Sequence, residues 1–128
     1  MALKNKKAYF EKIFEVKKFF INNRYNFKEN DILLIQIIKS DEPKKERIRG
    51  ILIFRELLED KEDESIKIYK RKWKYVIIPN KLIRLPEEEW FNLEDIIEEA
   101  KIYYGRAEAV RIKEKHEPLI RSKIAKYI

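Results

Sequence analysis

The chain has 128 residues, of which 45% are hydrophobic and 41% are charged, and its formal net charge at pH 7 is +7. This hydrophobic share excludes a disordered protein, and the length predicts one domain over residues 1–128 with a single core. The absence of cysteine excludes disulfides, thiolate metal sites and a cysteine nucleophile, and a single histidine, His116, excludes a multi-histidine metal site.

The composition also bears on location and partners. No apolar run approaches the roughly 18 residues that span a bilayer, and the opening MALKNKKAYFEK has no apolar signal core. We therefore expect a cytoplasmic protein. Abundant Lys, Glu and Ile beside a single Met fits a heat-adapted source such as a thermophilic archaeon. The positive net charge favours anionic partners, above all nucleic acid.

The first half of the chain predicts a helix followed by strands. Residues 8–22 place apolar side chains near one helical face, although part of this stretch also alternates as a strand does. Residues 32–38 hold six apolar residues in seven positions, which predicts a strand buried on both faces. The charged residues 41–47 predict a solvated turn, and residues 48–54 predict the next strand. Gly50 inside that strand indicates a bulge, a sharp bend or a close ligand.

The middle of the chain predicts a turn and a long strand. The acidic residues 56–65 are typical of a turn, and residues 66–79 alternate as one strand or a bent pair that ends at Pro79. Residues 80–86 predict a short extended piece, which Pro86 closes.

The last third predicts mainly helix. Residues 86–90 indicate one helical turn that begins at a proline, and residues 92–104 a helix that Asn92 caps and Gly105 ends. In that helix Asp95 stands three residues after Asn92, the spacing of a reciprocal cap. A short strand over residues 107–112 and a terminal helix over residues 116–128 follow. The whole order predicts an α+β fold with a largely antiparallel sheet or small barrel.

Charge is distributed in blocks. Residues 51–64 carry two cationic side chains against six acids, a net charge of −4. Residues 65–85 carry seven Lys or Arg and no acid, a net charge of +7, and residues 86–99 carry seven acids and no cation. Cations hold phosphate, and aromatic faces stack on bases at roughly 1–3 kcal/mol each. The basic block interleaves both kinds of side chain, so it is the best candidate for a binding surface.

We therefore predict a non-catalytic domain that binds DNA or RNA through this block. The predicted phosphate contacts are Lys70, Arg71, Lys72 and Lys74, extended by Arg47 and Arg49 on the neighbouring strand. The predicted base site contains Trp73 and Tyr75, with Tyr69 beside them. No cofactor and no metal is expected.

Other interpretations stay open. The basic block can instead pair with the acidic segments while Trp73 belongs to the core. The blocks can also pair between subunits, which would make the chain an assembly module and a homo-oligomer. A third alternative is a nucleotide-acting enzyme that uses carboxylates such as Glu87 or Glu94. Only Gly50 and Gly105 are available, so there is no Gly-rich phosphate loop.

The order KENDILLIQ, RIRGILIF, WKYVIIPNKLIRL, FNLEDIIEEAK and AEAVRIKEKHEPLI is similar to that of EVE-like domains of the PUA-like superfamily. The likeness covers roughly residues 28–128 and lies in hydropathy and order rather than in one motif. The corresponding positions are Asp31, Gly50, Tyr75, Pro79, Leu93, Ile96, Ile97 and Arg111.

This resemblance implies a small pseudo-barrel with flanking helices and an aromatic pocket that can receive a modified or flipped base from DNA or RNA. The chain departs from the pattern at its start, because EVE-like domains usually begin with a Trp-bearing strand and Ala8–Asn23 contains no Trp. Trp73 and Trp90 are then the indoles left for a base pocket, with Tyr25, Tyr69 and Tyr75 as supplements.

Overall fold

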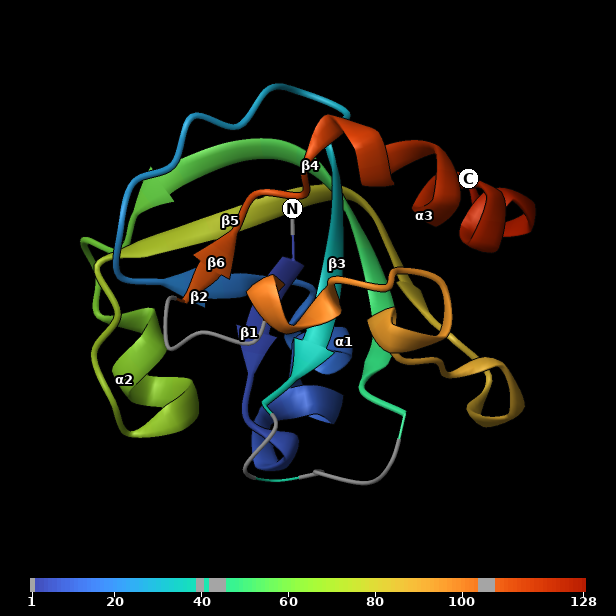
Figure 1. Ribbon diagram of the computed structural model, residues 1–128. Coiled ribbons are helices and arrows are strands. Elements are labelled where there is room, and N and C mark those ends of the chain that lie inside the picture. The colour runs from blue at the N-terminus through green and yellow to red at the C-terminus, as the bar shows by residue number, and fades with distance from the viewer. Residues whose placement is uncertain (1, 39–40, 42–45, 104–107) are drawn as a thin grey trace.

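The computed structural model describes residues 2–38, 41, 46–103 and 108–128, and the fold is α+β. One six-stranded sheet, in the order β2-β5-β4-β3-β1-β6, curls into a half-barrel, and three short helices flank it (Figure 1). The strands are β1 (Ala2–Asn5), β2 (Phe19–Ile21), β3 (Ile32–Ile37), β4 (Ile48–Glu59), β5 (Tyr75–Arg84) and β6 (Ala109–Val110). The helices are α1 (Phe10–Val16), α2 (Glu64–Tyr69) and α3 (Glu117–Ile124). The predicted α+β fold with a largely antiparallel sheet and the shape of a small pseudo-barrel is thus confirmed.

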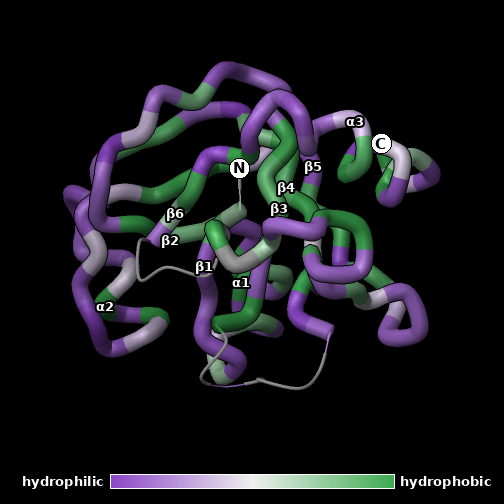
Figure 2. Tube along the Cα trace, in the orientation of Figure 1, coloured by the Kyte–Doolittle hydropathy of each residue, from purple (hydrophilic) through white to green (hydrophobic). Residues whose placement is uncertain are grey.

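The centre of the sheet is the antiparallel set β3, β4 and β5, which Figure 2 shows as largely hydrophobic beside polar outer loops. The continuous apolar run of β3 is buried along almost its whole length, as predicted. The predicted strand over residues 48–54 exists but is longer, because β4 runs on through Glu59 into the acidic segment predicted as a turn. Pairing of Glu59 with Tyr75 holds those acidic residues in the ladder.

Gly50 lies beside a bulge in β4, as the sequence indicated. Ile35 pairs with Gly50 and Gln36 with Ile48, so Arg49 is the extra residue. A Cβ on Gly50 would stand 3.1 Å from the tip of Ile35 and 3.3 Å from the backbone oxygen of Ile83. The glycine therefore serves close packing inside the curl.

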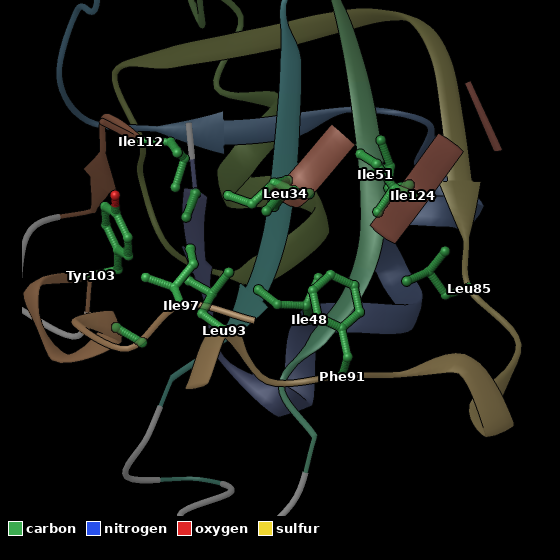
Figure 3. Packing of buried hydrophobic residues seen from close by; sticks show 13 residues of the cluster. Leu34, Ile48, Ile51, Leu85, Phe91, Leu93, Ile97, Tyr103, Ile112 and Ile124 are labelled. Carbon is green, nitrogen blue, oxygen red and sulfur yellow. The ribbon is translucent and has the colours of Figure 1, made fainter. Parts of the chain in front are cut away.

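Two apolar clusters cover the two faces of the sheet. All six strands contribute to one cluster, so it fills the inside of the curl, and α1 adds Phe10 and Ile13 to it. The other cluster lies on the outer face, where Leu34, Ile48 and Ile51 meet Phe91 and residues of the C-terminal third (Figure 3). Burying apolar area on both faces is what holds a half-open sheet of this size.

The helix predicted over residues 8–22 is shorter than expected. A turn at residues 7–9 leads into α1, which ends at Lys17 in the left-handed conformation, with its N–H bonded to the Ile13 oxygen at 2.8 Å. Residues 19–21 then form β2, because three consecutive buried residues pair with β5. The alternation within residues 8–22 does not explain β2, because Phe19, Phe20 and Ile21 are all buried.

The strand predicted over residues 66–79 was wrong in its first half. Residues 64–69 form α2, and β5 begins only at Tyr75. Pro79 was also expected to end the strand, whereas β5 continues to Arg84. Pro79 pairs with Phe54 between two register shifts, where the ladder is already interrupted and a missing N–H costs little.

The C-terminal third holds short 3₁₀ turns where a helix was expected. The turn after Pro86 at Glu87–Glu89 is as predicted, and the Asn92 N–H donates to Asp95 at 2.9 Å in the expected reciprocal cap. The predicted helix over residues 92–104 is instead two separate turns, Leu93–Asp95 and Ala100–Tyr103. Its expected end at Gly105 lies outside the described residues. The predicted strand and terminal helix exist as β6 and α3, followed by a turn at Ala125–Tyr127.

Candidate functional site

The residues with the strongest predicted binding role lie where α2 turns into β5. Lys70 ends α2 in the left-handed conformation and donates its N–H to the Ile66 oxygen at 2.8 Å. The next four residues form an irregular segment that reaches Tyr75 at the start of β5. The predicted cations and Trp73 are therefore on a short connection rather than on one face of a strand.

A buried carboxylate fixes the shape of this connection. Asp60 is only 6% exposed and accepts hydrogen bonds from the N–H groups of Glu64 at 2.9 Å and Ser65 at 3.0 Å. Its own N–H donates to the Lys74 oxygen at 2.9 Å, which closes the segment against the end of β4. The Ser65 hydroxyl donates to Asp60 and accepts the Trp73 N–H at 3.0 Å. Asp60 and Ser65 thus set the position of the Trp73 backbone.

Electrostatics agree with this geometry. Burial by itself raises the pKa of Asp60, but hydrogen bonds from Ser65, Glu64 and Lys72 outweigh that desolvation, and the pKa lies below its ordinary value. The carboxylate is charged at neutral pH, and Lys72 is its cationic partner.

Trp73 packs into a group of four rings, which we call the aromatic cluster: Tyr9, Phe20, Tyr69 and Trp73. The ring centres of Tyr9 and Tyr69 are 5.0 Å apart, and those of Tyr69 and Trp73 are 5.3 Å apart, both in edge-to-face geometry. Phe20 lies 5.9 Å from Tyr69. Burial, followed by the charge of Glu15 and by Tyr9, raises the pKa of Tyr69 to about 12. Trp73 and Tyr69 each keep part of their surface exposed.

A small hollow lies against the aromatic cluster. Its volume is about 20 Å³, which is room for one water molecule and far less than a base. Asn5, at the end of β1, lines this hollow together with Tyr9, Tyr69 and Trp73. The Asn5 Oδ1 atom is buried and accepts no hydrogen bond from any residue that the structure describes. An unused acceptor therefore lies at the wall of the aromatic cluster.

Three of the four predicted phosphate-binding cations lie within three residues of Trp73 along the chain and are exposed. Lys70, Arg71 and Lys74 are exposed, and none forms an ion pair with another described residue. The guanidinium carbon of Arg71 lies 4.8 Å from the centre of the Trp73 ring. Lys72 differs from these three in being paired with carboxylates. Its Nζ is 2.9 Å from Asp63 and also contacts Asp60, and these partners raise the pKa of Lys72.

Arg47, Arg49 and Trp90 do not join this surface. They lie near the opposite end of the β4–β5 ladder: Arg49 is ten residues, or roughly 33 Å along the strand, from Glu59, and Arg47 is further still. Arg47 is 3% exposed and contacts Glu94 at 3.1 Å. Arg49 is 4% exposed and lies 4.0 Å from the centre of the Trp90 ring.

The two remaining tyrosines line the rim of the inner core. Tyr75 and Tyr25 are both half-buried and pack against the inner cluster. Arg24 lies 6.0 Å above the Tyr75 ring, and Tyr25 contacts Phe27 with ring centres 5.6 Å apart. Burial and the nearby Glu108 raise the pKa of Tyr25. Neither ring takes part in the ring contacts of the aromatic cluster.

The alternative enzymatic carboxylates are dispersed. Glu87 is exposed on its 3₁₀ turn, and Glu94 is held by Arg47. Among the described residues, no three His, Cys, Asp or Glu side chains come together as ligands for a metal ion. In the same part of the chain, every helix is too short or too polar to cross a bilayer.

Sequence reasoning missed half of this site. Asn5, Tyr9 and Phe20 come from the first 20 residues, and the sequence holds no local signal that they meet Trp73. Ser65 was also missed, because it lies in a segment predicted as a turn and its contact with Asp60 depends on how β4 ends.

A scan against models of known protein families finds no family that matches the chain, and a search of curated protein sequences finds no match. The resemblance to EVE-like domains therefore stays a prediction.

Proposed function

We propose that the protein binds single-stranded or locally unpaired nucleic acid at the aromatic cluster and the cations beside it. The observation that carries the proposal is that Lys70, Arg71 and Lys74 flank Trp73 in the chain, and that Trp73 is partly exposed and has its backbone N–H bonded to Ser65. An accessible ring beside unneutralised cations is the combination that tracks a phosphate backbone while stacking a base.

The cations and the ring would contact different parts of the nucleic acid. The ammonium groups of Lys70 and Lys74 would contact phosphates, and Arg71 would leave the Trp73 ring for a phosphate when a base takes its place. Stacking on one ring contributes roughly 1–3 kcal/mol. Three phosphate contacts on a single strand give a plot of log K against log salt with a slope of about −2.

The hollow beside the ring suggests how a base would be read. Its present volume of about 20 Å³ excludes a base, so Tyr69 or Trp73 would have to rotate for a flipped or modified base to enter. Asn5 Oδ1 would then accept a hydrogen bond from an exocyclic amino group, which adenine, cytosine and guanine carry and thymine and uracil lack. We therefore expect adenine- or cytosine-rich strands to bind more tightly than thymine-rich ones.

The test is fluorescence anisotropy with labelled single-stranded DNA and RNA oligonucleotides over a salt series. Replacing Lys74 by Gln is expected to weaken binding and to make the salt slope shallower by about 0.7. Trp73→Phe is expected to weaken binding with the slope unchanged, because stacking is not ionic. Arg121→Gln, the same loss of charge on α3, serves as the control and is expected to change neither.

Absence of salt-dependent binding by the unmodified protein at low ionic strength would overturn the proposal. Light scattering at the same concentrations tests the rival assembly function. A mass that rises with concentration and falls with salt, without oligonucleotide binding, would favour pairing between subunits.

A further inference from the structure

A second cavity lies away from this surface, between β3 and α3. Figure 1 shows α3 on the opposite side of the molecule from α2, which precedes the nucleic-acid surface proposed above. The volume of the cavity is about 140 Å³. An engineered apolar cavity of about 150 Å³ takes up benzene, so this space accommodates one ring or a branched chain of similar size. The apolar residues that line it include Phe27, Ile32, Leu34, Ile112, Ile120 and Ile124.

The cavity floor is built from the sheet and the last helix. Ile112 and Ile124 lie on either side of Leu34 (Figure 3), and all three are buried. Ile32 is only partly buried, which leaves the cavity accessible from the end of β3. The floor alone would accept any apolar group of the right size, so the chemistry of the rim decides the ligand.

The rim carries charges of both signs. Arg111 and Arg121 are exposed and form no ion pair with any residue in the described part of the chain. Glu117, one helical turn before Arg121, is likewise exposed and without an ion pair among the described residues. Asp31 also lines the cavity and accepts the Lys28 N–H at 2.8 Å. Two guanidinium groups and two carboxylates thus line a cavity whose floor is apolar.

A free α-amino acid with an apolar side chain matches this arrangement. Guanidinium groups hold a carboxylate through paired hydrogen bonds, and a carboxylate such as Glu117 holds an ammonium group. The side chain of leucine, isoleucine or phenylalanine would fill the apolar floor. We propose that the cavity between β3 and α3 binds a free branched-chain or aromatic amino acid. The proposal is independent of nucleic-acid binding, because it uses none of the same residues.

The experiment compares three probes that separate the parts of the ligand. Leucine carries both charges, 4-methylpentanoate lacks the ammonium group, and isopentylamine lacks the carboxylate. Binding is followed by isothermal titration calorimetry and by methyl shifts of isoleucine-labelled protein. We expect leucine to shift the Ile120 and Ile124 methyl signals saturably. Each truncated probe is expected to bind at least about tenfold more weakly, since each loses a hydrogen-bonded charge.

Variants locate the site. Arg121→Gln and Glu117→Gln are each expected to weaken leucine binding about tenfold or more. Ile32→Phe is expected to abolish it by filling the cavity while leaving both arginines in place. Lys113→Gln removes one charge from an exposed neighbour that does not line the cavity, and is expected to have no effect. Circular dichroism and urea unfolding verify that each variant is folded.

Two results would overturn the proposal. One is the absence of saturable methyl shifts at about 10 mM leucine, ten times a millimolar Kd. The other is equal binding of 4-methylpentanoate and leucine, since the acidic rim would then contribute nothing. Oligonucleotide binding measured on the same samples shows whether the aromatic cluster is intact in either case.

Discussion

The most informative perturbation is the exchange of the buried Asp60 for asparagine. The amide keeps the shape of the carboxylate, so one oxygen can still accept the Glu64 N–H. The other oxygen becomes an NH₂ group, which cannot accept from the Ser65 N–H or its hydroxyl. Lys72 also loses a charged partner.

The expected cost follows from these contacts. A hydrogen bond to a charged acceptor contributes roughly 1.5–3 kcal/mol, and a buried donor left without an acceptor costs a comparable amount. Asp60→Asn is therefore expected to lower the free energy of unfolding by about 3 kcal/mol. Asp63→Asn is the matched control, because Asp63 also pairs with Lys72 but has a side chain that is 59% exposed. Its effect is expected to be much smaller, as for surface ion pairs generally.

The pH dependence provides a second check. Because the pKa of Asp60 is lowered in the folded state, its stabilisation is present above the ordinary carboxyl pKa of about 3.9. It is lost as the pH falls from there through the folded-state pKa. Urea unfolding followed by tryptophan fluorescence, near neutral pH and in strong acid, is the assay. Equal effects of the two substitutions, or a difference between Asp60→Asn and the unmodified protein that persists in acid, would refute the reasoning.

Three further substitutions test the fold, each by urea unfolding. Gly50→Ala puts a Cβ 3.1 Å from Ile35 and 3.3 Å from a backbone oxygen. Overpacking is expected to lower the free energy of unfolding by about 1–3 kcal/mol. An unchanged free energy would show that the sheet adjusts at this position. Tyr103→Phe removes a buried hydroxyl that contacts His116 Nδ1 at 2.6 Å and accepts the Lys113 N–H, at a cost of about 1–3 kcal/mol. Glu11→Gln weakens an exposed pair with Arg84 and is expected to cost less than about 1 kcal/mol; a larger loss would contradict the assignment of that pair as a surface contact.

The central strands could be predicted because their pattern is local. Residues 32–38 are nearly all apolar, and burial on both faces of a central strand requires such a run. The bulge beside Gly50 had a local signal as well, since a lone glycine inside a strand has few other uses. The last residues of β4, Glu56–Glu59, could not be predicted as strand. Their acidic side chains are typical of a turn, and pairing with β5 holds them in the sheet.

Helix α2 shows the limit of reasoning from alternation. Ile66 and Ile68 stand two residues apart, which fits a strand, yet Ile66 is exposed in the helix. What begins the helix is the carboxylate of Asp60, which lies outside it and binds its first N–H groups. Such a contact depends on how β4 ends, so the sequence of the segment itself does not contain the information.

Only part of the candidate site was predicted, because the rest is brought in from distant segments of the chain. Lys70, Arg71 and Trp73 are neighbours in sequence and stay neighbours in space. Their partners Tyr9 and Asn5 arrive through β1 and the turn before α1, more than 60 residues earlier. Arg49, in contrast, lies on the strand next to β5 but at its far end, so strand adjacency alone did not imply a shared surface.

A last test separates the structural role of Trp73 from a binding role. Its ring packs on Tyr69, so Trp73→Phe is expected to lower stability whatever the function. Lys74 is exposed and forms no ion pair with a described residue, so Lys74→Gln is expected to leave stability unchanged. If both residues contact one oligonucleotide, the binding loss of the double variant will differ from the sum of the single losses. A Trp73→Phe variant that binds the oligonucleotide as well as the unmodified protein would show that the aromatic cluster serves packing alone.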